Sequence, residues 1–275
     1  MTELLAKKVF SNKDLVAVEV HAVGPGIGAV YSSREPESDK EKNEDAAALF
    51  NVNGQSSVLV VADGVGGHRA GERASSIAVK SIQTSLKEPF EDKSLRPNII
   101  NAFEKANQAV MDLGVGAATT LVVVEIQGEQ IRPYHVGDSE ILVVGQRGKL
   151  KLQIVPHSPV GYAVQSGMLD EDSAMYHEDR HLVSNLIGTA DMHIVVGAPF
   201  KLSRRDTVLL ASDGLADNLY LEEIVELIRK GPLDEAAEAL AQKARDRMSN
   251  PAEGAPSKPD DLTFILFRLG AAASA

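Results

Sequence analysis

The chain contains no cysteine among its 275 residues. This absence excludes disulfide bonds, thiolate-bound metals and a cysteine nucleophile. No stretch reaches the roughly 18 apolar residues that a membrane-spanning helix requires. Met1–Lys8 also lacks the apolar run of a secretory signal. We therefore expect a cytoplasmic protein that does not span a membrane.

Basic residues are in short supply, with 28 Lys and Arg against 39 Asp and Glu and a formal net charge of −11. Nucleic acids and anionic membranes bind to basic surfaces, so we expect neither as a partner. The same charge balance would repel a phosphate dianion. A protein of this composition that acts on phosphate needs cations bound among its carboxylates to reverse the local field.

The length and the 44% content of hydrophobic residues allow a sizeable core. We predict a single domain over residues 1–270, with a flap-like insertion at about 157–185 and a disordered tail at 271–275. The chain has no heptad segment, and we expect a monomer.

Short runs rich in Val, Ile and Leu, bounded by Gly, Asp or Asn, predict strands. These runs are Leu15–Val20, Ala46–Val52, Ser57–Ala62, Thr119–Ile126, Gln130–Val136, Glu140–Gly145, Val195–Gly197, Thr207–Ala211 and Thr263–Leu269. Amphipathic patterns predict helices at Glu72–Lys87, Pro97–Leu113, Leu221–Arg229 and Leu233–Met248. Because strands and helices do not alternate strictly, we expect an α+β fold of stacked antiparallel sheets covered by helices.

Aspartates occur where these predicted strands begin or end. They are Asp63, Asp138, Asp213 and Asp260, and Asn43-Glu44-Asp45 precedes one further strand. A single Asp-Gly pair is most often only a turn. Several carboxylates that converge, however, stay ionised together only beside a cation. Oxygen ligands of this kind suit Mg²⁺ and Mn²⁺, so the pattern predicts a carboxylate metal site.

A competing motif lies in the segment His177-Glu178-Asp179-Arg180-His181. It matches H-E-x-x-H, in which two histidines on one face of a helix bind zinc and the glutamate is the base of a metalloprotease. Ser184 and Ile187 stand where the extended form of that motif has Gly and His. The alternative reading is a solvated stretch of the insertion.

The aspartates belong to motifs that resemble those of the metal-dependent serine/threonine protein phosphatases of type 2C, especially the compact bacterial members. The matching segments run in the order that this family shows. They are Asn43-Glu44-Asp45-Ala46, Val61-Ala62-Asp63-Gly64 with its continuation to Ser75, Gly116–Leu121, His135-Val136-Gly137-Asp138-Ser139, Leu210-Ala211-Ser212-Asp213-Gly214-Leu215 and Asp260-Asp261-Leu262-Thr263.

The resemblance implies a central β-sandwich flanked on both sides by helices, in four layers. It also implies two Mn²⁺ or Mg²⁺ ions at one end, possibly with a third. Asp63 would bridge both ions and the carbonyl of Gly64 would complete one of them. Asp213 and Asp260 would bind the other ion. Asp45 would bind directly or through water, in preference to Glu44, and Asp138 would hold the third, weaker ion.

Three positions depart from the family pattern. Val65 stands where many members have a histidine as candidate general acid, and His68 should not inherit that role. Arg34 is the candidate for the phosphate-binding arginine, although it lies farther than usual before Asn43. Pro156-His157-Ser158 replaces an Asp-His-Ser stretch.

The resemblance implies that phosphoserine and phosphothreonine in proteins are hydrolysed by metal-activated water, without a protein nucleophile. An opposing serine/threonine kinase is the expected counterpart. Two alternatives stay open at this point. One is a catalytically inactive phosphatase fold that acts as a binding or regulatory module, and the other is a zinc metalloprotease that uses His177, Glu178 and His181.

Overall fold

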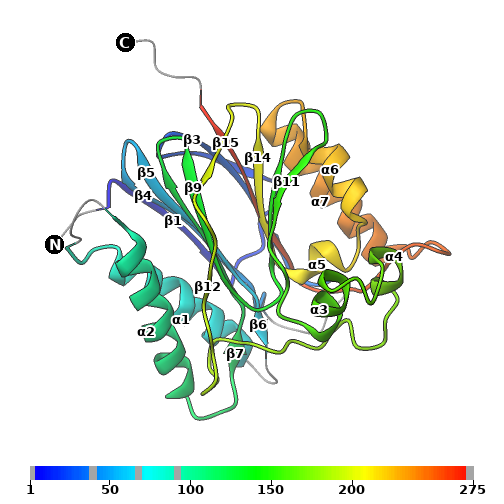
Figure 1. The fold of residues 1–275 in the computed structure, drawn as a ribbon, viewed down its shortest axis with the longest axis horizontal. Coiled ribbons are helices and arrows are strands. Elements are labelled where there is room, and N and C mark those ends of the chain that lie inside the picture. Colours follow the sequence, from blue (N-terminus) through cyan, green and yellow to red (C-terminus); the bar gives the residue numbers. More distant parts are fainter. Residues whose placement is uncertain (1–3, 37–41, 66–69, 90–93, 271–275) are drawn as a thin grey trace.

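Two antiparallel sheets lie face to face in the computed structural model, which describes residues 4–36, 42–65, 70–89 and 94–270 (Figure 1). The first sheet has the order β1 (Ala6–Ser11), β4 (Ala46–Asn53), β5 (Ser56–Ala62), β8 (Leu121–Gln127), β9 (Gln130–Val136) and β12 (Val195–Val196), and β13 (Phe200–Lys201) also pairs with β9. The second has the order β11 (Leu150–Gln153), β10 (Glu140–Val144), β14 (Thr207–Ala211), β15 (Leu262–Leu269), β3 (Gly26–Ser33) and β2 (Glu19–Val23).

Helices cover the outer face of each sheet (Figure 1). The first sheet packs against α1 (Ala70–Ser85) and α2 (Arg96–Met111), and the second against α6 (Leu221–Ile228) and α7 (Leu233–Ser249). Three shorter helices, α3 (Pro159–Gln165), α4 (Glu171–Ala174) and α5 (Asp213–Ala216), gather at one end of the second sheet. The predicted α+β class, with a sandwich between two helical layers, is confirmed.

The central strands are apolar at nearly every position because both of their faces are buried. In β5, Leu59 and Val61 point into the core between the sheets, whereas Val58 and Val60 face α1 and α2. The same division on β14 and β15 supplies one core between the sheets and another under α6 and α7. Three apolar layers therefore separate the four layers of structure.

The predicted helices are found within two residues of their bounds, whereas several strands were misjudged. The predicted strand Leu15–Val20 is wrong, because β2 begins only at Glu19. The prediction also missed β1, β3 and β11. Strand β3 contains glycine because its backbone lies very close to β15: a Cβ at Gly26 would lie 2.2 Å from the carbonyl oxygen of Arg268.

The segment 157–185 forms α3, α4 and connecting turns beside α5. Helix α3 begins after Ser158, whose hydroxyl accepts the Gly161 N–H at 2.9 Å, and Pro159 occupies the first turn.

None of the helices in the described ranges is long and apolar enough to cross a membrane.

Leu59 tests the core between the sheets, since its side chain is fully buried there. Leu59→Ala should lower the free energy of unfolding by ~2–5 kcal/mol, because it removes buried methyl groups and leaves a cavity. Leu5→Ala is the matched control, since Leu5 is 67% exposed. Urea unfolding of both variants measures the difference, and equal stabilities would contradict this packing.

Candidate metal centre

Two aspartates meet at one end of the first sheet. Asp45 precedes β4 and Asp63 follows β5, and the register pairs their neighbours Ala46 and Ala62. The main chain of Asp63 is fixed from the side: its N–H donates to the hydroxyl of Thr120 at 3.0 Å, and its carbonyl accepts the hydroxyl of Thr119 at 2.7 Å. The strand pairing therefore places both carboxylates at the same edge.

The second sheet brings two more aspartates to the same end of the sandwich. Asp213 begins α5 directly after β14, and Asp260 precedes β15, the partner of β14. The hydroxyl of Ser212 donates to the carboxylate of Asp45 at 2.8 Å, which joins the two sheets. Asp45 itself is buried, with 2% of its surface exposed.

Electrostatics show that these groups converge. Burial raises the pKa of Asp63 well above its ordinary value, and the charges of Asp213, Asp45, Asp260 and Asp138 raise it further. Burial, followed by the charges of Asp261 and Asp260, raises the pKa of Asp45 in the same way. The carboxylates of the two sheets therefore lie close enough to raise one another's pKa values.

Asp138 lies in the turn between β9 and β10. Burial, and then the charge of Asp213, raise the pKa of its carboxyl to about 7. The preceding Gly137 has φ +103°, and a Cβ there would lie 2.6 Å from Thr120, so only glycine fits. The N–H of Gly137 donates to Nδ1 of His157 at 3.1 Å, which anchors this turn to the segment 157–185.

Lys258 supplies positive charge beside the aspartates of the second sheet. Its Nζ lies 2.9 Å from the carboxylate of Asp213, 3.1 Å from Asp260 and 2.7 Å from Asp217. Nothing in the sequence patterns indicated this residue, because its partners are up to 45 positions away. In the ranges that the structure describes, no three Asp, Glu, His or Cys side chains surround one point closely enough to hold an ion.

The donor set nevertheless fits a hard divalent cation. All of the converging side chains carry oxygen, which Mg²⁺ and Mn²⁺ prefer. Burial is the largest cause of the raised pKa values of Asp45, Asp63 and Asp260, and the charges of neighbouring aspartates raise them further. A bound cation would favour the ionised form of these groups. In this structure, Asp213 and Asp260 are both paired with the ammonium of Lys258. The chemistry of the donors is thus in place, with an ammonium as their present counter-ion.

Gly64 and Glu44 pack tightly beside Asp63. A Cβ at Gly64 would lie 2.3 Å from the carbonyl oxygen of Gly71 and 2.6 Å from that of Glu44, so only glycine allows this approach. The N–H of Glu44 donates to the carboxylate of Asp261 at 2.7 Å, and the N–H of Glu35 donates to the same carboxylate at 2.8 Å. Sequence reasoning did not single out Asp261, although its pairing with Asp260 was a visible signal.

Arg34 directly follows β3 at the same edge of the second sheet. The guanidinium Nε of Arg34 donates to the carboxylate of Asp14 at 2.7 Å, and the main-chain N–H of Arg34 donates to the same carboxylate at 2.8 Å. The structure therefore shows Arg34 in an ion pair with Asp14. His68 lies outside the described residues.

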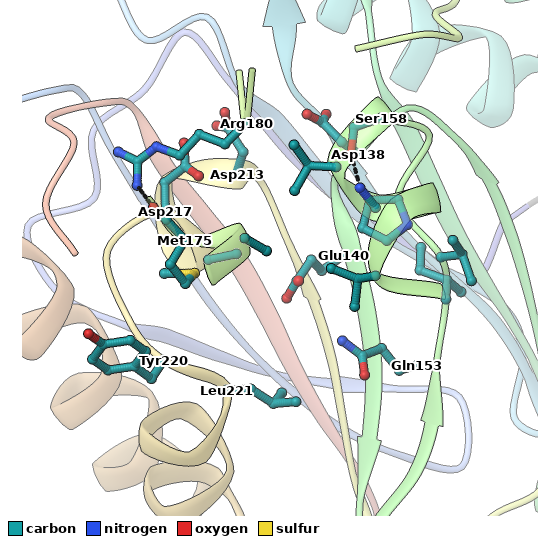
Figure 2. Close-up of a pocket in the computed structure, with 18 of the residues that line it drawn as sticks. Asp138, Glu140, Gln153, Ser158, Met175, Arg180, Asp213, Asp217, Tyr220 and Leu221 are labelled. Atoms are coloured by element: carbon teal, nitrogen blue, oxygen red, sulfur yellow. Dashed lines mark hydrogen bonds between the residues drawn. The ribbon is translucent and has the colours of Figure 1, made fainter. Parts of the chain in front are cut away.

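A pocket of about 420 Å³ adjoins the centre. Figure 2 shows Asp138 and Asp213 at one end of this pocket and Leu221 at the other. The pocket lies between the segment 157–185, strands β10 and β11, and helices α5 and α6. Its side chains are apolar over much of the wall, with Arg180 donating to the carbonyl of Met175 at 2.5 Å.

The family profile described as protein phosphatase 2C matches residues 34–250. The chain belongs to the protein phosphatase 2C family. The chain is 29% identical over 221 residues to the serine/threonine phosphatase stp of Listeria monocytogenes, covering 74% of this chain and 85% of that protein. The crystal structure of phosphatase Stp1 from Staphylococcus aureus matches with a TM-score of 0.77 and 26% identity, covering 91% of this chain and 98% of that one.

A structure of the catalytic domain of the serine/threonine protein phosphatase PstP with two manganese ions matches with a TM-score of 0.70 and 25% identity. It covers 88% of this chain and 96% of that one. The predicted family, fold and metal-dependent protein phosphatase function are confirmed, and the family's dependence on metal ions applies to this phosphatase.

The zinc-protease alternative finds no support in the geometry of this phosphatase. Helix α4 ends at Ala174, and His177–His181 lies in turns, so the two histidines do not share a helical face. Nδ1 of His177 instead accepts the N–H of Asp179 at 3.1 Å. The H-E-x-x-H match is a coincidence of sequence.

The crowded carboxylates predict how the stability of the ion-free phosphatase depends on pH. The pKa of Asp138 is raised to about 7, so the folded state binds this proton more tightly than the unfolded chain. That contribution is fully present below the unfolded pKa, near 4, and is lost as the pH rises through about 7. In chelator, the melting temperature of Asp138→Asn should therefore fall less than that of the parent between about pH 6 and pH 8.5.

The comparison with the parent removes an opposing effect. Burial lowers the pKa values of His135 and His157 to about 4, which destabilises both proteins equally as the pH falls below the unfolded value. Asp112→Asn, on the exposed end of α2, is the matched control and should follow the parent. If the melting temperatures of Asp138→Asn and the parent fall equally over this pH range, the pKa of Asp138 is not raised in the folded protein.

Proposed function

We propose that this phosphatase hydrolyses phosphoserine and phosphothreonine monoesters in proteins with water activated at a two-metal centre. The proposed ligands are Asp45, Asp63, the carbonyl of Gly64, Asp213 and Asp260, with Asp138 for a third, weaker ion. The observation that carries this proposal is the convergence of Asp45, Asp138, Asp213 and Asp260 on Asp63 at one end of the sandwich. Burial raises the pKa of Asp63, and the charges of these four aspartates raise it further.

Bound ions would lower the pKa of a coordinated water and neutralise the phosphoryl charge. The chain's own residues hold the ligands in place for this chemistry. The hydroxyl of Thr120 accepts the main-chain N–H of Asp63, and the hydroxyl of Ser212 orients Asp45 by donating to Oδ2. Glu44 packs over the first turn of α1, which supports Asp45 as the nearer ligand.

We propose Arg34 as a ligand of the substrate phosphate. Its position at the same sheet edge supports this role, since the next residue, Glu35, donates its N–H to Asp261 beside Asp260. Binding phosphate would require the guanidinium to leave Asp14, an ion pair in which both side chains are 40% exposed. Exposed pairs of this kind contribute about 0–1 kcal/mol, so a dianion can compete for the arginine.

The pocket beside Asp138 and Asp213 supports a protein substrate. Its apolar wall includes Ile154, Val160 and Leu221 and lies next to the proposed site of reaction. We propose that a side chain of the phosphoprotein near the phosphorylated residue enters this pocket. An opposing kinase, the monomeric state, a cytoplasmic location, the choice of Mn²⁺ or Mg²⁺, and the single domain over 1–270 with its flap-like insertion stay predictions.

Asp63 tests the two-metal proposal most directly. Asp63→Asn removes the proposed bridging charge at nearly constant shape, so Mn²⁺ affinity and turnover of a phosphothreonine peptide should fall together, the rate by several orders of magnitude. In chelator the variant should melt no lower than the parent, because it relieves repulsion, and added Mn²⁺ should stabilise it less. Titration calorimetry, melting curves and peptide assays measure these changes.

Asp112→Asn serves again as the control and should bind Mn²⁺ like the parent. Activity of the parent that survives complete chelation, or near-parental turnover in Asp63→Asn, would contradict the proposed centre. Retained ion binding with no phosphatase activity in the parent would instead favour an inactive binding module.

A charged residue introduced into the pocket tests whether the pocket binds the protein substrate without taking part in the hydrolysis. Leu221→Asp should lower kcat/KM for a phosphothreonine peptide by roughly tenfold or more, because it places a charge where apolar contact is expected. The small substrate p-nitrophenyl phosphate should be affected much less, since it need not reach that wall. Val16→Asp, at an exposed position, is the control. Equal losses on both substrates would contradict the pocket assignment.

A further inference from the structure

Lys258 joins three carboxylates at the proposed centre. Its ammonium contacts Asp213 and Asp260, which are the two proposed ligands from the second sheet, and also Asp217 one turn farther along. The contacts with Asp213 at 2.9 Å and Asp217 at 2.7 Å are charge-assisted hydrogen bonds, and the contact with Asp260 at 3.1 Å is an ion pair. The side chain of Lys258 is 28% exposed, so water screens these contacts less than on an open surface.

The backbone of Lys258 is fixed by one buried side chain. The N–H of Lys258 donates to Oδ1 of Asn218 at 2.8 Å, and Nδ2 of Asn218 donates to the carbonyl of Lys258 at 2.8 Å. The same Nδ2 also donates to the carbonyl of Gly214 at 2.9 Å, in the helix that begins with Asp213. Asn218 is fully buried. The ammonium is therefore held in register with Asp213.

The loop that carries Lys258 is anchored at two further points. The hydroxyl of Ser257 donates to the carbonyl of Arg247 in α7 at 2.9 Å. The carbonyl of Gly254 accepts the hydroxyls of Tyr176 at 3.0 Å and Tyr220 at 3.1 Å. These hydrogen bonds fix the loop that carries the ammonium. Lys258 therefore differs from a flexible surface lysine that pairs with whichever acidic residues lie nearby.

The charges around this ammonium explain what it does. Burial raises the pKa of Asp260, and the charge of Asp213 raises it further, whereas Lys258 lowers it. Lys258 also lowers the pKa of Asp138, against burial and the charge of Asp213. The ammonium therefore stabilises the ionised carboxylates on the side of the centre where the proposal places a metal ion.

We propose that Lys258 is a positioning residue, a built-in cation that holds Asp213 and Asp260 in the ion-free protein and yields them to the incoming ion. This inference rests on the proposed function of the same carboxylates. An ion at Asp213 and Asp260 must displace the ammonium or remain close to a like charge. Lys258 therefore stabilises the ion-free fold and weakens ion binding at these two ligands.

The experiment compares Lys258→Met with the parent. In chelator the variant should melt at a lower temperature, because the carboxylates lose their counter-ion. In calorimetry with Mn²⁺ alone, the Mn²⁺ site at Asp213 and Asp260 should tighten by roughly tenfold, since no ammonium has to be displaced. Mn²⁺ should consequently raise its melting temperature more than that of the parent. Neither readout depends on phosphatase activity.

Two controls separate charge from shape. Lys258→Arg retains a cation and should behave like the parent in both measurements. Lys243→Met removes a lysine of α7 whose ammonium lies 2.8 Å from the carboxylate of Glu223 in α6, and it should leave Mn²⁺ affinity unchanged. If Lys258→Met does not fold, as judged by its far-ultraviolet circular dichroism, Lys258→Gln removes the charge while it keeps a hydrogen-bonding group.

The outcomes distinguish this inference from the proposed function. Two Mn²⁺ ions bound by the parent, with unchanged or weaker affinity in the uncharged Lys258 variants, would overturn the role of Lys258 and leave the metal centre intact. A parent that binds no Mn²⁺ would overturn the proposed function and the inference with it. Tighter binding together with a lower melting temperature in chelator supports both.

Discussion

Repulsion among carboxylates is the constraint on which the functional end of this protein depends. Five aspartates from two sheets and one turn meet there, and burial with mutual charge raises the pKa of Asp63, Asp45, Asp138 and Asp260. Such a cluster is unfavourable in a fold that holds no cation. A net charge of −11 increases this difficulty. The surrounding structure is best understood as the means of holding these groups together.

The sandwich supplies the rigidity that this requires. Asp45, Asp63, Asp213 and Asp260 lie next to the ends of buried strands, so they cannot retreat from their neighbours without disturbing a packed core. Hydrogen bonds then lock the junctions: Ser212 of the second sheet reaches Asp45 of the first, and Asp261 holds the N–H groups of Glu35 and Glu44. The energy of three apolar cores offsets local repulsion at one end.

The sequence predicted those features that local pattern determines. Buried strands such as β5 and β14 show as continuous apolar runs, and an aspartate after each run lies at a sheet end. Amphipathic helices such as α1 and α7 are equally visible. Strand β3, with its glycines, was missed because its conformation depends on contact with β15, 231 positions away at Ser32 and Thr263. The individual ligand roles came from the family resemblance.

Ion pairs between distant residues could not be predicted. Nothing in the sequence near Arg34 indicates its pairing with Asp14, and nothing near Lys258 indicates Asp213. Both depend on which loops meet once the sheets are stacked. The H-E-x-x-H match fails for the complementary reason, since a motif acquires its meaning only on a helix, and here α4 ends before the first histidine.

The two sides of the proposed centre differ in how they compensate for charge. On the side of the first sheet, Asp45 receives a neutral hydroxyl from Ser212 and stays crowded by Asp261. On the side of the second sheet, Asp213 and Asp260 share the ammonium of Lys258. The loop that carries this ammonium also accepts the hydroxyl of Tyr176, from the segment that walls the pocket. The charge balance of the centre and the wall of the pocket therefore depend on one loop, and the asymmetry of the centre follows from that loop.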